Sequence, residues 1–80
     1  MSQSLQKYID AFEKALGIEK MNIGVSLAYN SVPEWDSLGH MALVSEIEEA
    51  FSVQFSTEEV IEFSDFKKGL EILGLKGQTF

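Results

Sequence analysis

Apolar residues near the start of the chain recur at the spacing of an amphipathic helix, and this pattern constrains the fold most strongly. Five of them, at positions i, i+3, i+4, i+7 and i+11, would form one stripe: Leu5, Tyr8, Ile9, Phe12 and Leu16. Polar and charged residues fill the opposite face, as expected for a helix that covers a core. Gly17 follows the stripe and favours the end of a helix. The pattern predicts a helix over about residues 3–16.

A second helical pattern begins at or near Ser37. Three apolar residues recur four positions apart, namely Leu43, Ile47 and Phe51. The acidic residues of the same stretch fall mostly on the other side, namely Glu46, Glu48 and Glu49. This arrangement predicts an amphipathic helix of about four turns, over about residues 37–51.

Two shorter helices are predicted after it. The run from Ser56 to Glu59 has the form of a capping box and predicts a short helix over about 57–62. Ser64 or Asp65 would cap a last helix over about 65–73. Its inward residues would be Phe66, Leu70 and Leu73, and Gly74 would end it. Gly69 inside this helix should weaken it by roughly 1 kcal/mol relative to alanine.

The segment 17–36 carries a competing signal. Alternate residues are apolar, which is typical of a strand: Met21, Ile23, Val25, Leu27 and Tyr29. No convincing second strand exists to pair with it, and a two-stranded pairing would be marginal. We therefore expect a long ordered loop that holds apolar side chains against the helices. The predicted fold is a single all-α domain over 1–80, a small up-down bundle of three main helices and one short helix.

Composition excludes several classes of function. The chain has no cysteine, so it can form neither a disulfide nor a thiolate metal site. Its net charge of −7 disfavours nucleic-acid binding and favours partner proteins with basic patches. A lone histidine and the absence of an Asp-x-Asp-x-Asp-Gly run argue against a metal site. With no signal peptide or membrane span in the sequence, we expect a cytoplasmic monomer that binds no membrane.

The stretch from Trp35 to His40 lies at the predicted junction of loop and helix. A serine at a helix start lies among backbone N–H groups without intrahelical partners, and these favour an anion. A phosphate ester on Ser37 would be held there without a basic side chain. An ordinary N-cap role for Asp36 or Ser37 explains the same residues equally well. Trp35 is expected to anchor the loop, and His40 to be a half-exposed helix residue.

Asp36-Ser37-Leu38 resembles the signature of the acyl carrier proteins. The resemblance extends along the following helix, where apolar and acidic residues fall at the family's positions: Leu43, Ile47, Glu48, Glu49 and Phe51. The order of helices and the long loop are also similar, so the likeness covers essentially the whole chain. It implies that a phosphopantetheinyl transferase attaches 4'-phosphopantetheine from coenzyme A to Ser37, using magnesium. The arm would carry an acyl-type intermediate as a thioester, and partner enzymes, not this chain, would catalyse the chemistry.

The resemblance also implies a partner surface along the second helix. Its candidate residues are Leu38, Met41, Val44, Glu46, Glu48 and Glu49, with Asp36 and Leu38 flanking the attachment site. A solvated face explains the glutamates equally well, and Met41 and Val44 have the helical spacing of core residues. Three residues depart from the commonest fatty-acid carriers: Gly39, Ala42 and Ser45. These departures indicate a carrier dedicated to a specialised biosynthetic pathway.

Two other classes of function compete with a carrier. An acidic helical adaptor that is never modified would account for the charge and the helices, but not for the Asp36-Ser37-Leu38 motif. An enzyme would use Ser37 as nucleophile and His40 as base, three positions apart on one helix face. The sequence lacks a Gly-x-Ser-x-Gly elbow and an evident residue to orient the histidine.

Overall fold

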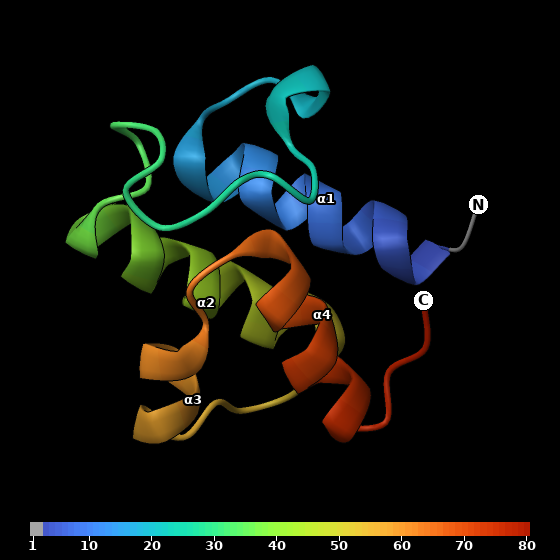
Figure 1. Ribbon diagram of the computed structural model, residues 1–80. Helices are drawn as coiled ribbons and strands as arrows, with labels where there is room; N and C mark the ends of the chain where they lie inside the picture. Colours follow the sequence, from blue (N-terminus) through green and yellow to red (C-terminus); the bar gives the residue numbers. More distant parts are fainter. Residues whose placement is uncertain (1–2) are drawn as a thin grey trace.

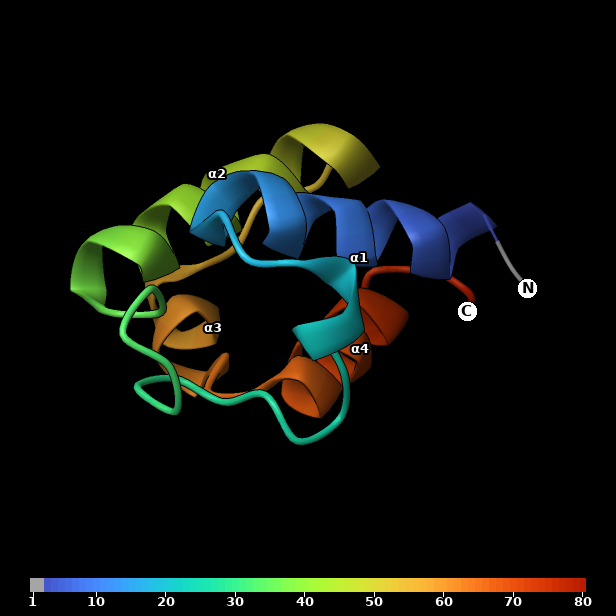
Figure 2. The ribbon, with the colours of Figure 1, turned by 90° about the horizontal axis from the view of Figure 1, so that it is seen from above.

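The computed structural model describes residues 3–80. It contains, in order, α1 (Gln3–Leu16), a 3-10 helix η1 (Lys20–Asn22), α2 (Ser37–Phe51), α3 (Thr57–Glu62) and α4 (Phe66–Leu75). The α1 and α2 helices lie side by side and run in opposite directions, and α3 and α4 pack beneath them (Figures 1 and 2). Over these 78 positions the only β pairing is an isolated bridge between Ala28 and Asp65. The all-α class is confirmed.

Three of the four helix ranges agree with the sequence prediction, and α4 differs at both ends. Asp65 is its N-cap, since its Oδ1 accepts a hydrogen bond from the Lys68 N–H at 2.7 Å. The prediction that Gly74 ends the helix is wrong, because α4 continues to Leu75. The left-handed backbone conformation falls instead on Gly77, with φ of 92°. At α1, Gly17 has φ of 68° and does end the helix, as predicted.

Aromatic side chains fill the centre of the bundle. Phe12 of α1 makes ring contacts with Tyr8, Trp35, Phe63 and Phe66, at centroid distances between 4.9 and 6.2 Å. The aliphatic part of the buried core comes from α1, the loop, α2 and α4: Leu16, Ile23, Leu27, Leu43, Val44, Ile47, Ile72 and Leu73. Val60 of α3 packs against it. Burial of side chains of this size contributes about 1.5–3 kcal/mol each. One continuous core therefore joins the four helices and the loop.

Tyr8 and Gly69 define the approach of α1 to α4. The buried Tyr8 hydroxyl donates a hydrogen bond of 2.6 Å to the Phe66 carbonyl, and burial raises the pKa of this phenol. A Cβ atom at Gly69 would collide with that hydroxyl and would lie 2.6 Å from Phe63 Cε1. Gly69 therefore weakens the helix locally but is required for this close packing.

The segment between α1 and α2 forms no strand and packs on the core as a loop. Ile23 and Leu27 are buried, whereas Met21 and Val25 of the same alternating series are exposed. Backbone hydrogen bonds tie the loop to the α3–α4 turn: Phe66 N–H donates to the Leu27 carbonyl at 2.9 Å. The apolar alternation is therefore not a strand pattern, because its members do not share one buried face.

Candidate functional site

Ser37 is the first residue of α2, and its side chain is exposed. Asp36 is the N-cap: its Oδ1 accepts a hydrogen bond from the Gly39 N–H at 2.8 Å. Of the two capping candidates, the structure thus assigns the role to Asp36, and the Ser37 hydroxyl is not used for capping. Its partner is instead the Tyr29 hydroxyl, at 3.1 Å.

Because Gly39 has no Cβ atom, the backbone of the loop at Glu34 can lie close to the first turn of α2. A Cβ atom at this position would collide with the Glu34 carbonyl oxygen and would lie 3.0 Å from Leu16 Cδ2. Any larger side chain at this position would meet the same backbone. Glycine at position 39 therefore has a local steric cause in this chain.

Trp35 and His40 connect the start of α2 to the segment around α3. Trp35 is fully buried and anchors the loop, as predicted, with its ring edge-on to Phe12 and Phe63. Its indole N–H donates to His40 Nδ1 at 2.9 Å. His40 Nε2 lies 2.8 Å from the Val60 carbonyl and must donate to it, because a carbonyl only accepts. His40 is half-buried and, in this arrangement, is the neutral tautomer with hydrogen on Nε2.

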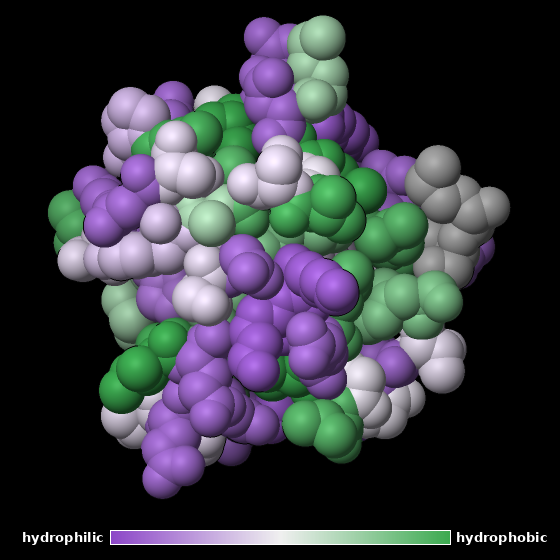
Figure 3. All heavy atoms as spheres, viewed as in Figure 1, coloured by the Kyte–Doolittle hydropathy of each residue, from purple (hydrophilic) through white to green (hydrophobic). Residues whose placement is uncertain are grey.

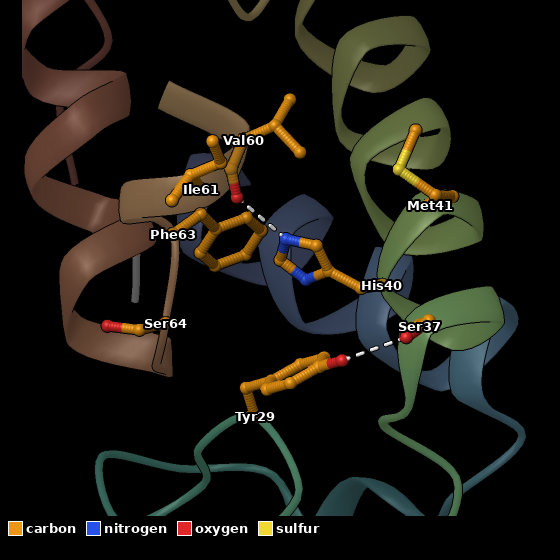
Figure 4. Close-up of a pocket in the computed structure, with 8 residues that line it drawn as sticks. All are labelled: Tyr29, Ser37, His40, Met41, Val60, Ile61, Phe63 and Ser64. Carbon is orange, nitrogen blue, oxygen red and sulfur yellow. Dashed lines mark hydrogen bonds between the residues drawn. The ribbon is translucent and has the colours of Figure 1, made fainter. Parts of the chain in front are cut away.

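An open pocket of about 340 Å³ lies beside Ser37, between the start of α2, the loop and the α3 segment (Figure 4). Its lining is mainly apolar: Tyr29, Ser37, His40, Met41, Val60, Ile61, Phe63 and Ser64. The volume falls within the few-hundred-Å³ range of small-molecule pockets. No lysine, aspartate or glutamate of the described chain is among these residues. The Ser37 hydroxyl therefore opens onto an apolar, uncharged hollow.

Exposed apolar side chains line this pocket or lie next to it in the chain. Ile61 and Met41 line the pocket and are 75% and 57% exposed, and Leu38, which follows Ser37 in the sequence, is 83% exposed. Other large apolar side chains are exposed away from the pocket, namely Met21, Val25 and Leu75, and Figure 3 shows hydrophobic side chains interspersed with hydrophilic ones on one face of the molecule. What distinguishes Met41 and Ile61 from these residues is their place at a pocket beside Ser37.

The predicted partner residues lie in three different surroundings. Leu38, Met41 and Glu49 are exposed on α2. The prediction for Val44 is wrong: it is only 3% exposed, because α2 turns this side chain into the core together with Leu43 and Ile47.

The side chains of Glu46 and Glu48 interact with other residues of the protein itself. A Glu46 carboxylate oxygen lies 3.5 Å from Lys14 Nζ of α1, in a partly exposed ion pair. The Glu48 carboxylate accepts a hydrogen bond from the Phe55 N–H at 2.8 Å and so holds the turn after α2. A partner would have to compete for Glu46 and Glu48, but not for Glu49.

A catalytic pair of Ser37 and His40 would be joined by a hydrogen bond, and the structure shows none between these two residues. Both His40 ring nitrogens contact other groups, and Ser37 Oγ contacts Tyr29. Among residues 3–80, no three metal-ligating side chains of His, Asp or Glu converge. None of the helices described is long and apolar enough to cross a membrane.

Tyr29, Val60 and Ile61 are site residues that sequence reasoning missed. Tyr29 stood in the apolar alternation of the loop, eight positions before Ser37, and no spacing rule links the two. Val60 and Ile61 were seen only as part of a short helix. Their role depends on where α3 packs, which is a property of the tertiary structure.

The chain matches no protein-family model, no curated protein and no solved structure.

Proposed function

We propose that this protein is an acyl carrier protein that bears 4'-phosphopantetheine on Ser37, within an acyl-carrier-type up-down bundle. One observation carries the proposal: the Ser37 hydroxyl is exposed at the first position of α2, is not used as a helix cap, and opens onto an apolar pocket. The hydroxyl of an ordinary N-cap serine accepts a hydrogen bond from the backbone N–H two or three residues later in the chain.

The attachment step uses Ser37 as the nucleophile, under catalysis by a transferase with magnesium. Ser37 Oγ forms a bond to the coenzyme A phosphorus that bears the pantetheine, and its proton passes to a base of the transferase. The bond from that phosphorus to the bridging oxygen of the diphosphate breaks, which releases adenosine 3',5'-bisphosphate. The attached arm supplies the terminal thiol that this cysteine-free chain lacks, and an acyl group is carried on it as a thioester.

The residues around Ser37 suit a phosphodiester. The N–H groups of Ser37 and Leu38 belong to the helix start, where backbone donors have no intrahelical partner and the helix dipole favours negative charge. The Asp36 carboxylate is engaged with the Gly39 N–H. Interaction of an anion with a helix start contributes typically 0.3–1 kcal/mol, so a phosphate can be accommodated without a neighbouring lysine.

Partner enzymes would approach along the exposed part of α2. Leu38 and Met41 offer apolar contacts next to the arm, and Glu49 offers a charge to basic patches. The net charge of −7 would accelerate encounter with such patches at low ionic strength. We place the carrier in the cytoplasm, as a monomer. Its departures from the common fatty-acid carriers at Ala42 and Ser45, which local packing does not explain, favour a specialised biosynthetic pathway.

The proposal is tested by incubating the protein with coenzyme A, magnesium and a broad-specificity phosphopantetheinyl transferase, followed by intact-mass measurement. We expect a gain of one phosphopantetheine in the wild type and no gain in Ser37→Ala. Ser64→Ala is the matched control, because it removes another hydroxyl from the same pocket and should still be modified. A folded wild-type protein that gains no mass with several transferases would contradict the proposal and favour the unmodified acidic adaptor.

A further inference from the structure

A hydroxyl from the long loop holds the Ser37 side chain. Tyr29 Oη lies 3.1 Å from Ser37 Oγ, and Figure 4 shows the tyrosine reaching across the pocket mouth toward the start of α2. The two residues are eight positions apart, so the contact depends on the folded path of the loop. No other side-chain hydrogen bond to Ser37 occurs within the part of the chain that the structure covers.

Tyr29 is itself held in place through its backbone and through its ring. The Tyr29 backbone N–H donates a hydrogen bond to the Ser64 carbonyl at 2.9 Å. Its ring packs edge-on against His40 at a centroid distance of 5.5 Å, and His40 is fixed by Trp35 and Val60. Tyr29 is nevertheless 38% exposed, so solvent and a bound partner can reach it. A fixed ring with an accessible hydroxyl is suited to orienting a reacting group.

Modification of Ser37 would change what this pair of hydroxyls can do. In the unmodified chain either hydroxyl can donate to the other. When Tyr29 donates, the Ser37 proton is left free to pass to a base of the transferase. Once Oγ has become an ester oxygen it carries no hydrogen, and the Tyr29 hydroxyl is the only donor left in the pair. A charged phosphate oxygen, now within reach, is the stronger acceptor.

Among the residues that the structure describes, the pocket offers a phosphate at Ser37 hydrogen-bond donors but no cationic side chain. The chain contains no arginine, and the described residues that line the pocket include no lysine. A phosphodiester at Ser37 would therefore find no cationic side chain in the pocket.

We propose that Tyr29 is a positioning residue for the modification of Ser37. Its hydroxyl orients Ser37 Oγ before transfer and donates a hydrogen bond to the phosphodiester afterwards. This inference rests on the proposed function. It extends that function by assigning a specific residue of the loop to hold the root of the arm.

The test compares Tyr29→Phe with the wild type and with Ser64→Ala. Tyr29→Phe keeps the ring that packs on His40 and removes only the hydroxyl, while Ser64→Ala removes a pocket hydroxyl that does not contact Ser37. Transfer kinetics are measured with coenzyme A and magnesium. The ³¹P resonance of each modified protein is then recorded, because it reports the hydrogen bonds of the phosphate itself.

We expect Tyr29→Phe to be modified with a kcat about threefold to tenfold lower and an unchanged KM for coenzyme A. Its ³¹P resonance should move away from that of the wild type, whereas Ser64→Ala should match the wild type in both measurements. Modification of Tyr29→Phe with wild-type kcat and an unmoved resonance would overturn the inference and leave the proposed function intact. A wild-type protein that is not modified at all would overturn both.

Discussion

Two glycines of α4 lie in opposite surroundings. Gly69 faces the Tyr8 hydroxyl and the Phe63 ring, where a Cβ atom does not fit, whereas nothing lies within 4 Å of a Cβ atom at Gly74. Helix propensity treats both alike and favours alanine at each by about 1 kcal/mol. At Gly69, but not at Gly74, the packing of α1 on α4 makes alanine less favourable than glycine for stability. Atoms inserted into a filled core force their neighbours to move.

Substitution of the two glycines tests this packing. We expect Gly69→Ala to lower the free energy of unfolding by about 1–3 kcal/mol, and Gly74→Ala to leave it unchanged or raise it by up to about 1 kcal/mol. Urea denaturation followed by the fluorescence of Trp35, the only tryptophan, measures both. Equal effects of the two substitutions would show that Tyr8 does not approach Gly69 as closely as described.

The loop between α1 and α2 is anchored through a few side chains. Leu27 is 4% exposed and Val25 is 76% exposed, although an alternating strand would place both on one face. The buried contact, together with the hydrogen bond from Phe66 N–H to the Leu27 carbonyl, fixes the path that brings Tyr29 to Ser37. The loop is thus a structural part of the candidate site.

Alanine substitution separates a loop anchor from an exposed neighbour. Leu27→Ala should reduce the free energy of unfolding by about 2–3 kcal/mol, because it removes buried methyl groups and leaves a cavity. Val25→Ala should change it by less than about 0.5 kcal/mol. Thermal and urea unfolding check both variants. The description of the loop would be wrong if Val25→Ala were as damaging as Leu27→Ala.

The short helix α3 depends on interactions at its first turn. Ser56 and Glu59 form a reciprocal capping box, and the Glu59 carboxylate also accepts a hydrogen bond of 2.8 Å from Lys76 Nζ after α4. The Lys76 ammonium and the Ser56 N–H both favour the charged carboxylate, so the pKa of Glu59 is lowered. A six-residue helix is marginal alone, so these ties help to place Val60 and Ile61 at the pocket.

The lowered pKa of Glu59 predicts a loss of stability in acid. Its contribution is fully present above the pKa of an unfolded glutamate, about 4.3, and is lost as the pH falls through the lower pKa of the folded state. Glu59→Gln should therefore be less stable than the wild type at pH 7, and the gap should close in acid. Urea midpoints across this range measure it. Glu58→Gln controls for the loss of one negative charge, and an identical gap for both variants would contradict the prediction.

Sequence pattern predicted what is local in this molecule and missed what depends on packing between elements. The stripes at Leu5–Leu16 and Leu43–Phe51 and the capping box at Ser56 are short-range patterns, so these helices were placed correctly. The prediction of Val44 as a partner residue is wrong because the width of the buried face of α2 depends on the elements packed around it. The contact between Tyr29 and Ser37 crosses a loop without regular structure, and no spacing rule predicts it.

The molecule places the exposed Ser37 beside an apolar pocket, on a small helical protein of net charge −7. α1 and α2 form its frame, the loop supplies Tyr29, and α3 supplies Val60 and Ile61. This division fits a protein that presents a cargo held by Ser37, with the chemistry left to its partners. The central claim is therefore covalent modification of Ser37, and it can be tested on the protein in its own cells.

The most direct measurement is the mass of the protein purified from the cells that produce it, with fragmentation of the peptide that contains Ser37. We predict a mass greater than that of the bare chain by one 4'-phosphopantetheine, located on Ser37, and loss of cellular function in Ser37→Ala. An unmodified chain whose Ser37→Ala variant retains full function would contradict the account.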